Sequence, residues 1–295
     1  MITNGSRKYK KAYMPKSTIP KNPDINSEIN NHAARLRDLA DLDYISARTL
    51  YRNQCYLEFY WYAQQSIEKY LKAIFIFCRK PNKKKTHDLG LLHCSVKNIT
   101  IYDMFLEFPP IIDDLVLYFD LLGSVDCRYN ELRRFSGELG ADIQFLDDSV
   151  IYIRRYCRNL YPQQNDLDDE KNAKALMRRL SLENSNKEQL RLSLYTGLLG
   201  NILRAPGKTK DKLKENLVWA NSYLLNEHQP ADTIIQQAII DLTPSIHDNP
   251  KLIKALRDLI SIPKNIDEKQ KGFTSRLIAI KRRIDKNLTS AKVSN

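Results

Sequence analysis

The fold is restricted above all by the segment 59–78, whose apolar residues recur in steps of three and four. They are Phe59, Ala63, Ile67, Tyr70, Leu71, Ile74, Phe75 and Cys78. This spacing places them on one face of an α-helix, and such a face is stable only when other helices cover it. Glycine is scarce, with nine residues in 295, which argues against a fold rich in glycine turns. We therefore predict an all-α fold.

Similar periods in the neighbouring segments predict a helical bundle over residues 29–162. Its other helices are expected at 33–51, after Pro81, at 109–122 and at 131–162. After the break at Pro81, Thr86 can cap the next helix, with Asp88 well placed at its positive end. Two prolines open the segment 109–122, as the first turn of a helix allows.

Three further parts are predicted around this bundle. Residues 1–28 hold three prolines and six Lys or Arg without a visible period, so we expect a flexible basic arm. Residues 163–175 are polar and acidic at their centre, which is typical of a linker. Residues 176–295 are expected to form a second, basic helical domain. Its helical segments, the first of which starts near the end of the linker, are 170–182, 186–203, 208–226, 230–242, 249–261 and 265–288.

The charge of the chain points to an anionic partner. Its formal net charge is +12 and its pI is about 9.3, which favours RNA, DNA, a nucleotide or an acidic protein. We find no dinucleotide fingerprint, P-loop or nucleophile elbow. The five cysteines are not spaced for a zinc site and are expected to be reduced core thiols of a cytoplasmic protein. No apolar run is long enough for a membrane span, and no metal or cofactor is expected.

Two motifs in the bundle carry a family resemblance. The first is Gln64-Gln65-Ser66-Ile67-Glu68-Lys69-Tyr70-Leu71-Lys72-Ala73, and the second is Thr86-His87-Asp88-Leu89. In this order and at this distance they resemble the HEPN (higher eukaryotes and prokaryotes nucleotide-binding) domain, over roughly residues 33–162. A later Arg128-Tyr129 resembles the Arg-Tyr-Pro of the same branch, although Asn130 stands where that branch has proline.

The resemblance implies an up-and-down helical bundle, usually dimeric, that binds nucleotides or RNA. Members of this family often belong to toxin–antitoxin, CRISPR or phage-defence systems, and some partner a small nucleotidyltransferase. Ribonuclease members share an Arg, four to six intervening residues and a His. None of the five histidines of this chain has an Arg at that distance upstream; Arg79, with seven residues between, comes nearest to His87.

The turn between the second and third helices is the first candidate site. Metal-independent cleavage of RNA needs a base and a cation, and His87 could be the base, with Arg79 or Lys83–Lys85 as the cation. Amide groups at the start of the following helix could also bind an anion. Alternatively, His87 hydrogen-bonds locally and the lysines are simply solvated.

Other basic residues could contact a nucleotide or RNA, and each also has a purely structural reading. Lys69 and Lys72 could line a pocket between helices or belong to surface ion pairs. Arg128 and Tyr129 could bind phosphate and stack on a base, and Arg282 and Arg283 lie on the basic C-terminal helix. The candidate binding residues are therefore Lys69, Lys72, Arg79, Lys83, Lys84, Lys85, Arg128, Tyr129, Arg282 and Arg283.

Three functions remain open at this point. The first is an RNA- or nucleotide-binding HEPN-domain protein of a prokaryotic defence or toxin–antitoxin system, working as a homodimer, with a nucleotidyltransferase or another defence-system protein as a candidate partner. The second is a metal-independent endoribonuclease that uses His87 and nearby cations in a dimer. The third is a protein-binding scaffold or antitoxin.

Overall fold

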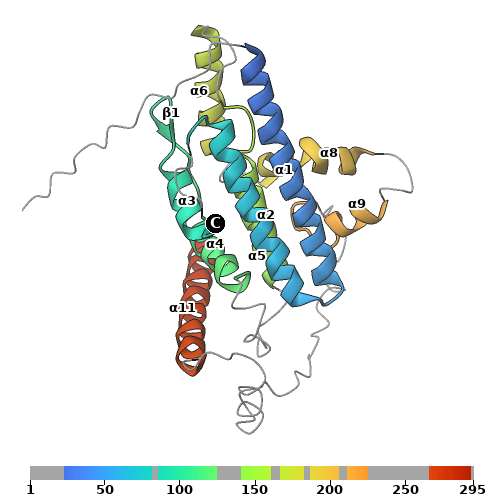
Figure 1. Ribbon diagram of the computed structural model, residues 1–295, viewed down its shortest axis with the longest axis vertical. Helices are drawn as coiled ribbons and strands as arrows, with labels where there is room; N and C mark the ends of the chain where they lie inside the picture. Colours follow the sequence, from blue (N-terminus) through green and yellow to red (C-terminus); the bar gives the residue numbers. More distant parts are fainter. Residues whose placement is uncertain are drawn as a thin grey trace, which may run out of the picture.

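The computed structural model describes residues 23–81, 86–124, 141–160, 167–182, 187–205, 211–224 and 266–293. Helices α1 (Pro23–Arg52) and α2 (Tyr56–Phe77) form a long antiparallel pair, and α3 (Leu89–Lys97), α4 (Pro110–Leu122) and α5 (Asp142–Arg154) pack around α2 (Figure 1). A hairpin of two-residue strands, β1 (Thr100–Ile101) and β2 (Met104–Phe105), joins α3 to α4. The predicted all-α architecture is therefore confirmed, with this small hairpin added.

Helix α2 is the centre of the bundle because it is buried on nearly every side. All eight residues of the predicted apolar stripe, from Phe59 to Cys78, are buried. Buried tyrosines add hydrogen bonds to this core: Tyr70 donates to Asp41 at 2.6 Å, and Tyr60 and Tyr118 donate to Asp142 at 2.5 and 2.6 Å. Each hydroxyl thus satisfies a carboxylate that would otherwise be costly to bury.

Several predicted helix ends lie close to the observed ones, but α5 ends at Arg154 rather than near Pro162, and a helix begins at Leu167 inside the predicted linker. Two further differences lie at the start of helices. Helix α1 ends at Arg52 and α4 begins at Pro110, as expected. However, α1 begins at Pro23, inside the segment expected to be a flexible arm. The N-cap of α3 is Asp88 rather than Thr86, because the Asp88 carboxylate accepts from the Leu91 amide at 2.7 Å.

The cysteines were predicted to be core thiols, and this is true of two of the four described ones. Cys78 and Cys157 are buried, and burial raises the pKa of both thiols, that of Cys157 to about 12. Cys55 and Cys94 are exposed, because they lie outside the apolar stripes of their helices. Cys127 lies outside the described residues.

Beyond residue 162 the described chain continues as short helices and one long one. These are α6 (Leu167–Leu182), α7 (Lys187–Leu192), the 3₁₀ turn η4 (Ser193–Tyr195), α8 (Gly197–Arg204), α9 (Asp211–Val218) and α11 (Ile266–Val293). The predicted helix at 186–203 is interrupted before Gly197, which adopts φ +58°. This left-handed conformation is strained for residues with a Cβ, so it favours glycine. The helices predicted at 230–242 and 249–261 lie outside the described residues.

Three buried arginines join these later helices to the bundle. Arg48 of α1, Arg154 of α5 and Arg155 just after α5 are at most 2% exposed. Each donates to backbone carbonyls of the later segments, which belong to Leu180, Ser193, Thr196, Asn216 and Trp219. Helices α8 and α9 pack on α1, and α11 packs on α4. The described helices of the predicted C-terminal domain thus contact the bundle directly, while its boundary with the bundle stays a prediction.

Within the described part of the chain, no helix has both the length and the apolar character to cross a membrane.

Candidate anion-binding site

The elbow between α2 and α3 brings three of the motif residues together. Nδ1 of His87 lies 2.9 Å from Oε1 of Glu68, and the ammonium group of Lys72 donates to the same oxygen at 2.6 Å. Glu68 and Lys72 are one helical turn apart on α2, whereas His87 enters from the segment just before α3. The Lys72 amine and the imidazole therefore lie side by side on one carboxylate oxygen.

Burial differs sharply within this group. The His87 side chain is 84% exposed, Lys72 is 31% exposed and Glu68 is only 5% exposed. The second carboxylate oxygen of Glu68 is buried without a hydrogen-bond partner. An ionised carboxylate only accepts, so Nδ1 of His87 carries the proton and Nε2 lies at the exposed edge of the ring. Glu68 thus fixes the tautomer and orientation of His87, as a carboxylate does for many functional histidines.

The start of α3 does not offer the free amides that the sequence suggested. Leu91 donates to Asp88, and Leu89 donates to Oδ1 of Asp120 on α4 at 3.0 Å. Gly90 also donates to Asp120, whose pKa is raised by burial and lowered less strongly by these hydrogen bonds. The expected anion site at this helix N-terminus is therefore wrong, because two carboxylates of the chain itself occupy it.

Arg79 turns away from His87 and binds the start of α1. It adopts a left-handed backbone conformation with φ 51°, and its guanidinium donates to the side chain of Asn30 at 2.6 Å and to the carbonyl of Asn26 at 3.2 Å. The Arg79 guanidinium also donates a hydrogen bond to the Ile76 carbonyl at 2.8 Å. The hydrogen bonds of Arg79 thus connect the end of α2 to the start of α1.

The remaining predicted binding residues fall into two groups. Lys69 forms an ion pair with Asp43 of α1, and Arg283 of α11 binds Asp114 of α4 at 2.7 Å, whereas Arg282 is exposed. Lys83, Lys84, Lys85, Arg128 and Tyr129 lie outside the described residues. Of the predicted set, the structure therefore brings His87 and Lys72 together on Glu68, whereas Lys69, Arg79 and Arg283 bind other partners.

Glu68 is a functional candidate that was not among the predicted site residues. The i,i+4 spacing to Lys72 did indicate their contact. Its burial and its contact with His87 depend on how the elbow folds back over α2, which the local pattern does not encode. Gln64, one turn earlier, is also buried and hydrogen-bonds Asp120.

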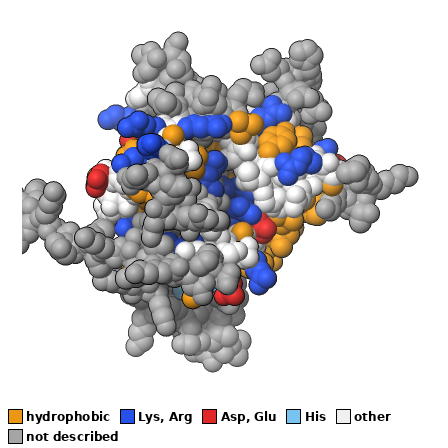
Figure 2. All heavy atoms as spheres, turned by 90° about the horizontal axis from the view of Figure 1, so that it is seen from above, with side chains coloured by type: hydrophobic (Ala, Val, Ile, Leu, Met, Phe, Trp, Pro, Cys, Tyr) orange, Lys and Arg blue, Asp and Glu red, His pale blue; other side chains and the backbone are white. Residues whose placement is uncertain are grey.

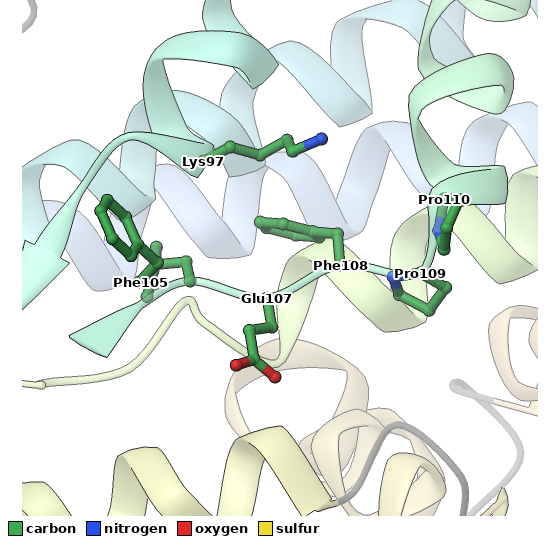
Figure 3. Close-up of a pocket in the computed structure, with 7 residues that line it drawn as sticks. Lys97, Phe105, Glu107, Phe108, Pro109 and Pro110 are labelled. Carbon is green, nitrogen blue, oxygen red and sulfur yellow. The ribbon is translucent and has the colours of Figure 1, made fainter. Parts of the chain in front are cut away.

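A second group of polar residues lies beside a shallow, mainly apolar pocket next to the hairpin (Figure 3). Lys97 stands at its edge, but both oxygens of Asp113 bind the Lys97 amine, at 2.9 and 2.7 Å. Figure 3 shows Glu107 pointing away from Lys97, and Phe108 packs edge-to-face on buried His93. With its cation already paired, this pocket offers little to a phosphate.

Basic side chains also gather at the end of the molecule where α1 begins and α2 ends. Figure 2 looks onto this end and shows many Lys and Arg side chains on the described surface, with few Asp or Glu among them. In the described part of the chain no cluster of His, Cys, Asp and Glu is arranged to hold a metal ion. The described part of the face in Figure 2 is therefore mainly basic.

Most of α1 and all of α2, α3 and α4 lie within the range of one family match. The model of the HEPN domain family matches residues 33–124, so this part of the chain is a HEPN domain. The match includes both motifs and His87 but ends at Ser124, short of the 162 expected from the sequence. No curated protein and no solved structure shows significant similarity to the chain.

Proposed function

We propose that this chain is an RNA- or nucleotide-binding HEPN-domain protein. The observation that carries the proposal is the pair of cationic or polar donors, His87 and Lys72, held side by side on Glu68 at the surface of the matched domain. The net charge of +12 supports it, because a basic surface gathers polyanions from solution. Lys83–Lys85 precede the elbow in the sequence and are part of the same proposal.

The test is binding of single-stranded RNA by fluorescence anisotropy at several salt concentrations. We expect measurable affinity at low salt and a linear loss of log affinity against log salt. Lys72→Ala is expected to weaken binding several-fold and to lower the salt slope by about one unit. Lys214→Ala, which removes an exposed lysine of α9, is the matched control and should change neither value. Absence of binding by the wild-type protein at low salt contradicts the proposal and favours a protein-binding scaffold or antitoxin.

A second candidate function is metal-independent cleavage of RNA. The observation that favours it is the contact of Glu68 with Nδ1 of His87, which leaves Nε2 at the exposed edge, where it could accept a proton from a 2′-hydroxyl. Cleavage in the presence of EDTA that disappears in His87→Ala, with RNA binding retained, would support this function. Persistence of cleavage in that variant would place the activity elsewhere.

The cellular setting of the proposal is a prokaryotic defence or toxin–antitoxin system, in which the chain acts as a homodimer through the HEPN bundle. A nucleotidyltransferase is the partner that the family implies. Genes adjacent to this one test the setting, and light scattering of the purified protein tests the dimer. A neighbouring nucleotidyltransferase gene supports the partner, and a monomeric mass contradicts the dimer.

A further inference from the structure

We propose that the exposed edge of His87, with Lys72 beside it, is a phosphodiester-binding site that protonation of the imidazole switches on. This inference rests on the proposed function, because it names how the same surface would recognise a polyanion. The ligand group is the non-bridging oxygens of a phosphodiester. The condition for binding is that the imidazole of His87 is protonated.

The switch follows from the hydrogen bond that Glu68 makes. Because Glu68 accepts the proton on Nδ1, the neutral ring presents only a lone pair at Nε2. A lone pair repels a phosphate oxygen. Once the ring is protonated, both nitrogens donate, and Nε2 can form a charge-assisted hydrogen bond to the phosphate. The orientation imposed by Glu68 therefore makes binding at this edge depend on the proton.

The local charge balance points in the same direction. Glu68 and Lys72 form an ion pair, so the group of three is neutral overall while His87 is neutral and carries one positive charge when His87 is protonated. Glu68 is nearly buried, whereas the imidazole and part of Lys72 face solvent, so an approaching phosphate meets the two donors. Binding and protonation then strengthen each other.

Three charged side chains in the described part of the elbow and its neighbouring helices have partners within the chain. Lys69 of α2 is paired with Asp43 of α1, and Asp88 caps α3 through the Leu91 amide. Asp120 of α4 accepts from the first amides of α3. Burial raises the pKa of the carboxyls of Asp43 and Asp120, so the contribution of the imidazole is isolated by comparing wild type with His87→Gln.

The experiment measures affinity against pH for a probe that does not itself titrate. A fluorescent 2′-O-methyl oligouridine with hydroxyl ends has no terminal phosphate monoester and cannot be cleaved through its 2′-oxygen. At constant low salt, we expect the wild-type affinity to rise roughly tenfold from about pH 8 to about pH 5.5. His87→Gln should bind with nearly constant affinity across this range. Circular dichroism at each pH confirms that the proteins remain folded.

Two further variants separate this site from general effects of pH. His32→Gln removes an exposed histidine of α1 and should leave the pH dependence unchanged. Glu68→Ala removes the carboxylate that orients the ring, so its gain in affinity at low pH should be smaller than that of wild type. A wild-type affinity that does not vary with pH, or an unchanged pH dependence in His87→Gln, overturns the inference and leaves the proposed function standing. No binding at any pH overturns both.

Discussion

Arg154 binds Asp41 through two parallel hydrogen bonds, from Nε to Oδ1 at 2.7 Å and from Nη2 to Oδ2 at 2.8 Å, deep between α5 and α1. The two side chains are at most 1% exposed. Arg154 also donates to the carbonyl of Thr196 at 2.8 Å, so one guanidinium joins the bundle to the segment before α8. Geometry of this kind allows an ion pair to offset the cost of burying its charges.

Replacement of Arg154 by methionine is expected to destabilise the protein strongly. Asp41 would keep its bond from Tyr70 but would remain buried without a cation, which typically costs about 3–5 kcal/mol. The double variant Arg154→Met/Asp41→Asn should lose less, because no charge is left behind. Urea unfolding followed by circular dichroism measures both values. A single variant within about 1 kcal/mol of wild type would contradict this account.

Truncation after residue 162 is expected to prevent folding of the remaining bundle. Arg48, Arg154 and Arg155 would lose the backbone acceptors that the later helices supply, and the α1 surface under α8 and α9 would be exposed. The measurement is soluble yield and helical circular dichroism of the fragment. Removal of residues 266–295 is the comparison, because it deletes α11 and leaves these arginine contacts intact; a folded, monodisperse 1–162 fragment would contradict the prediction.

His93 is expected to make the protein less stable in mild acid. Burial lowers the pKa of His93 from its ordinary 6.5 to about 4, and the nearby carboxylate of Asp113 opposes this only in part. The unfolded chain therefore takes up a proton on this ring at a pH at which the folded protein does not. The corresponding stability is fully present above about pH 6.5 and is lost as the pH falls toward about 4.

The expected loss from this group is roughly 2 kcal/mol at pH 5. The free energy of unfolding of wild type and His93→Gln should be measured from about pH 7 to pH 5. The contributions of other groups, including the carboxyls of Asp142 and Asp147 whose pKa values burial raises, are shared by both proteins. The two curves should converge as the pH falls; parallel curves would exclude this role of His93.

Two glycines offer a matched pair of substitutions with opposite effects. At Gly123, which ends α4, a Cβ would lie 2.4 Å from the Cβ of Gln64 and 2.8 Å from the Tyr60 carbonyl. Gly123→Ala should therefore cost about 1–3 kcal/mol. At Gly272 of α11 nothing lies within 4 Å, so Gly272→Ala should stabilise by about 0.5–1 kcal/mol. Thermal unfolding of both variants measures the contrast, and equal effects would contradict it.

The helices of the HEPN region were largely predictable, since their signals are local. The stripe of α2, the prolines before α4 and the end of α1 at Arg52 each depend on residues within one or two turns. The two motifs likewise identified the domain. The break before Gly197 was not predicted, because the extended backbone of Thr196 and the left-handed φ of Gly197 are set by packing that the local period does not encode.

The site was only partly predictable, because its key contacts cross between helices. The sequence indicated His87 and Lys72 as candidates, but not that buried Glu68 holds both. It also suggested that Arg79 would face the elbow, whereas the left-handed turn at Arg79 directs it to α1. Ion pairs between α1 and α2, or α4 and α11, depend on packing distances that no single segment specifies.

The carboxylate of Asp120 anchors the first turn of α3 from outside that helix. This bond ties the start of α3, two residues after His87, to α4. Asp114 of the same helix α4 accepts from Asn287 and pairs with Arg283 of α11. A continuous series of polar contacts therefore connects the elbow, through α4, to a helix almost two hundred residues further along the chain.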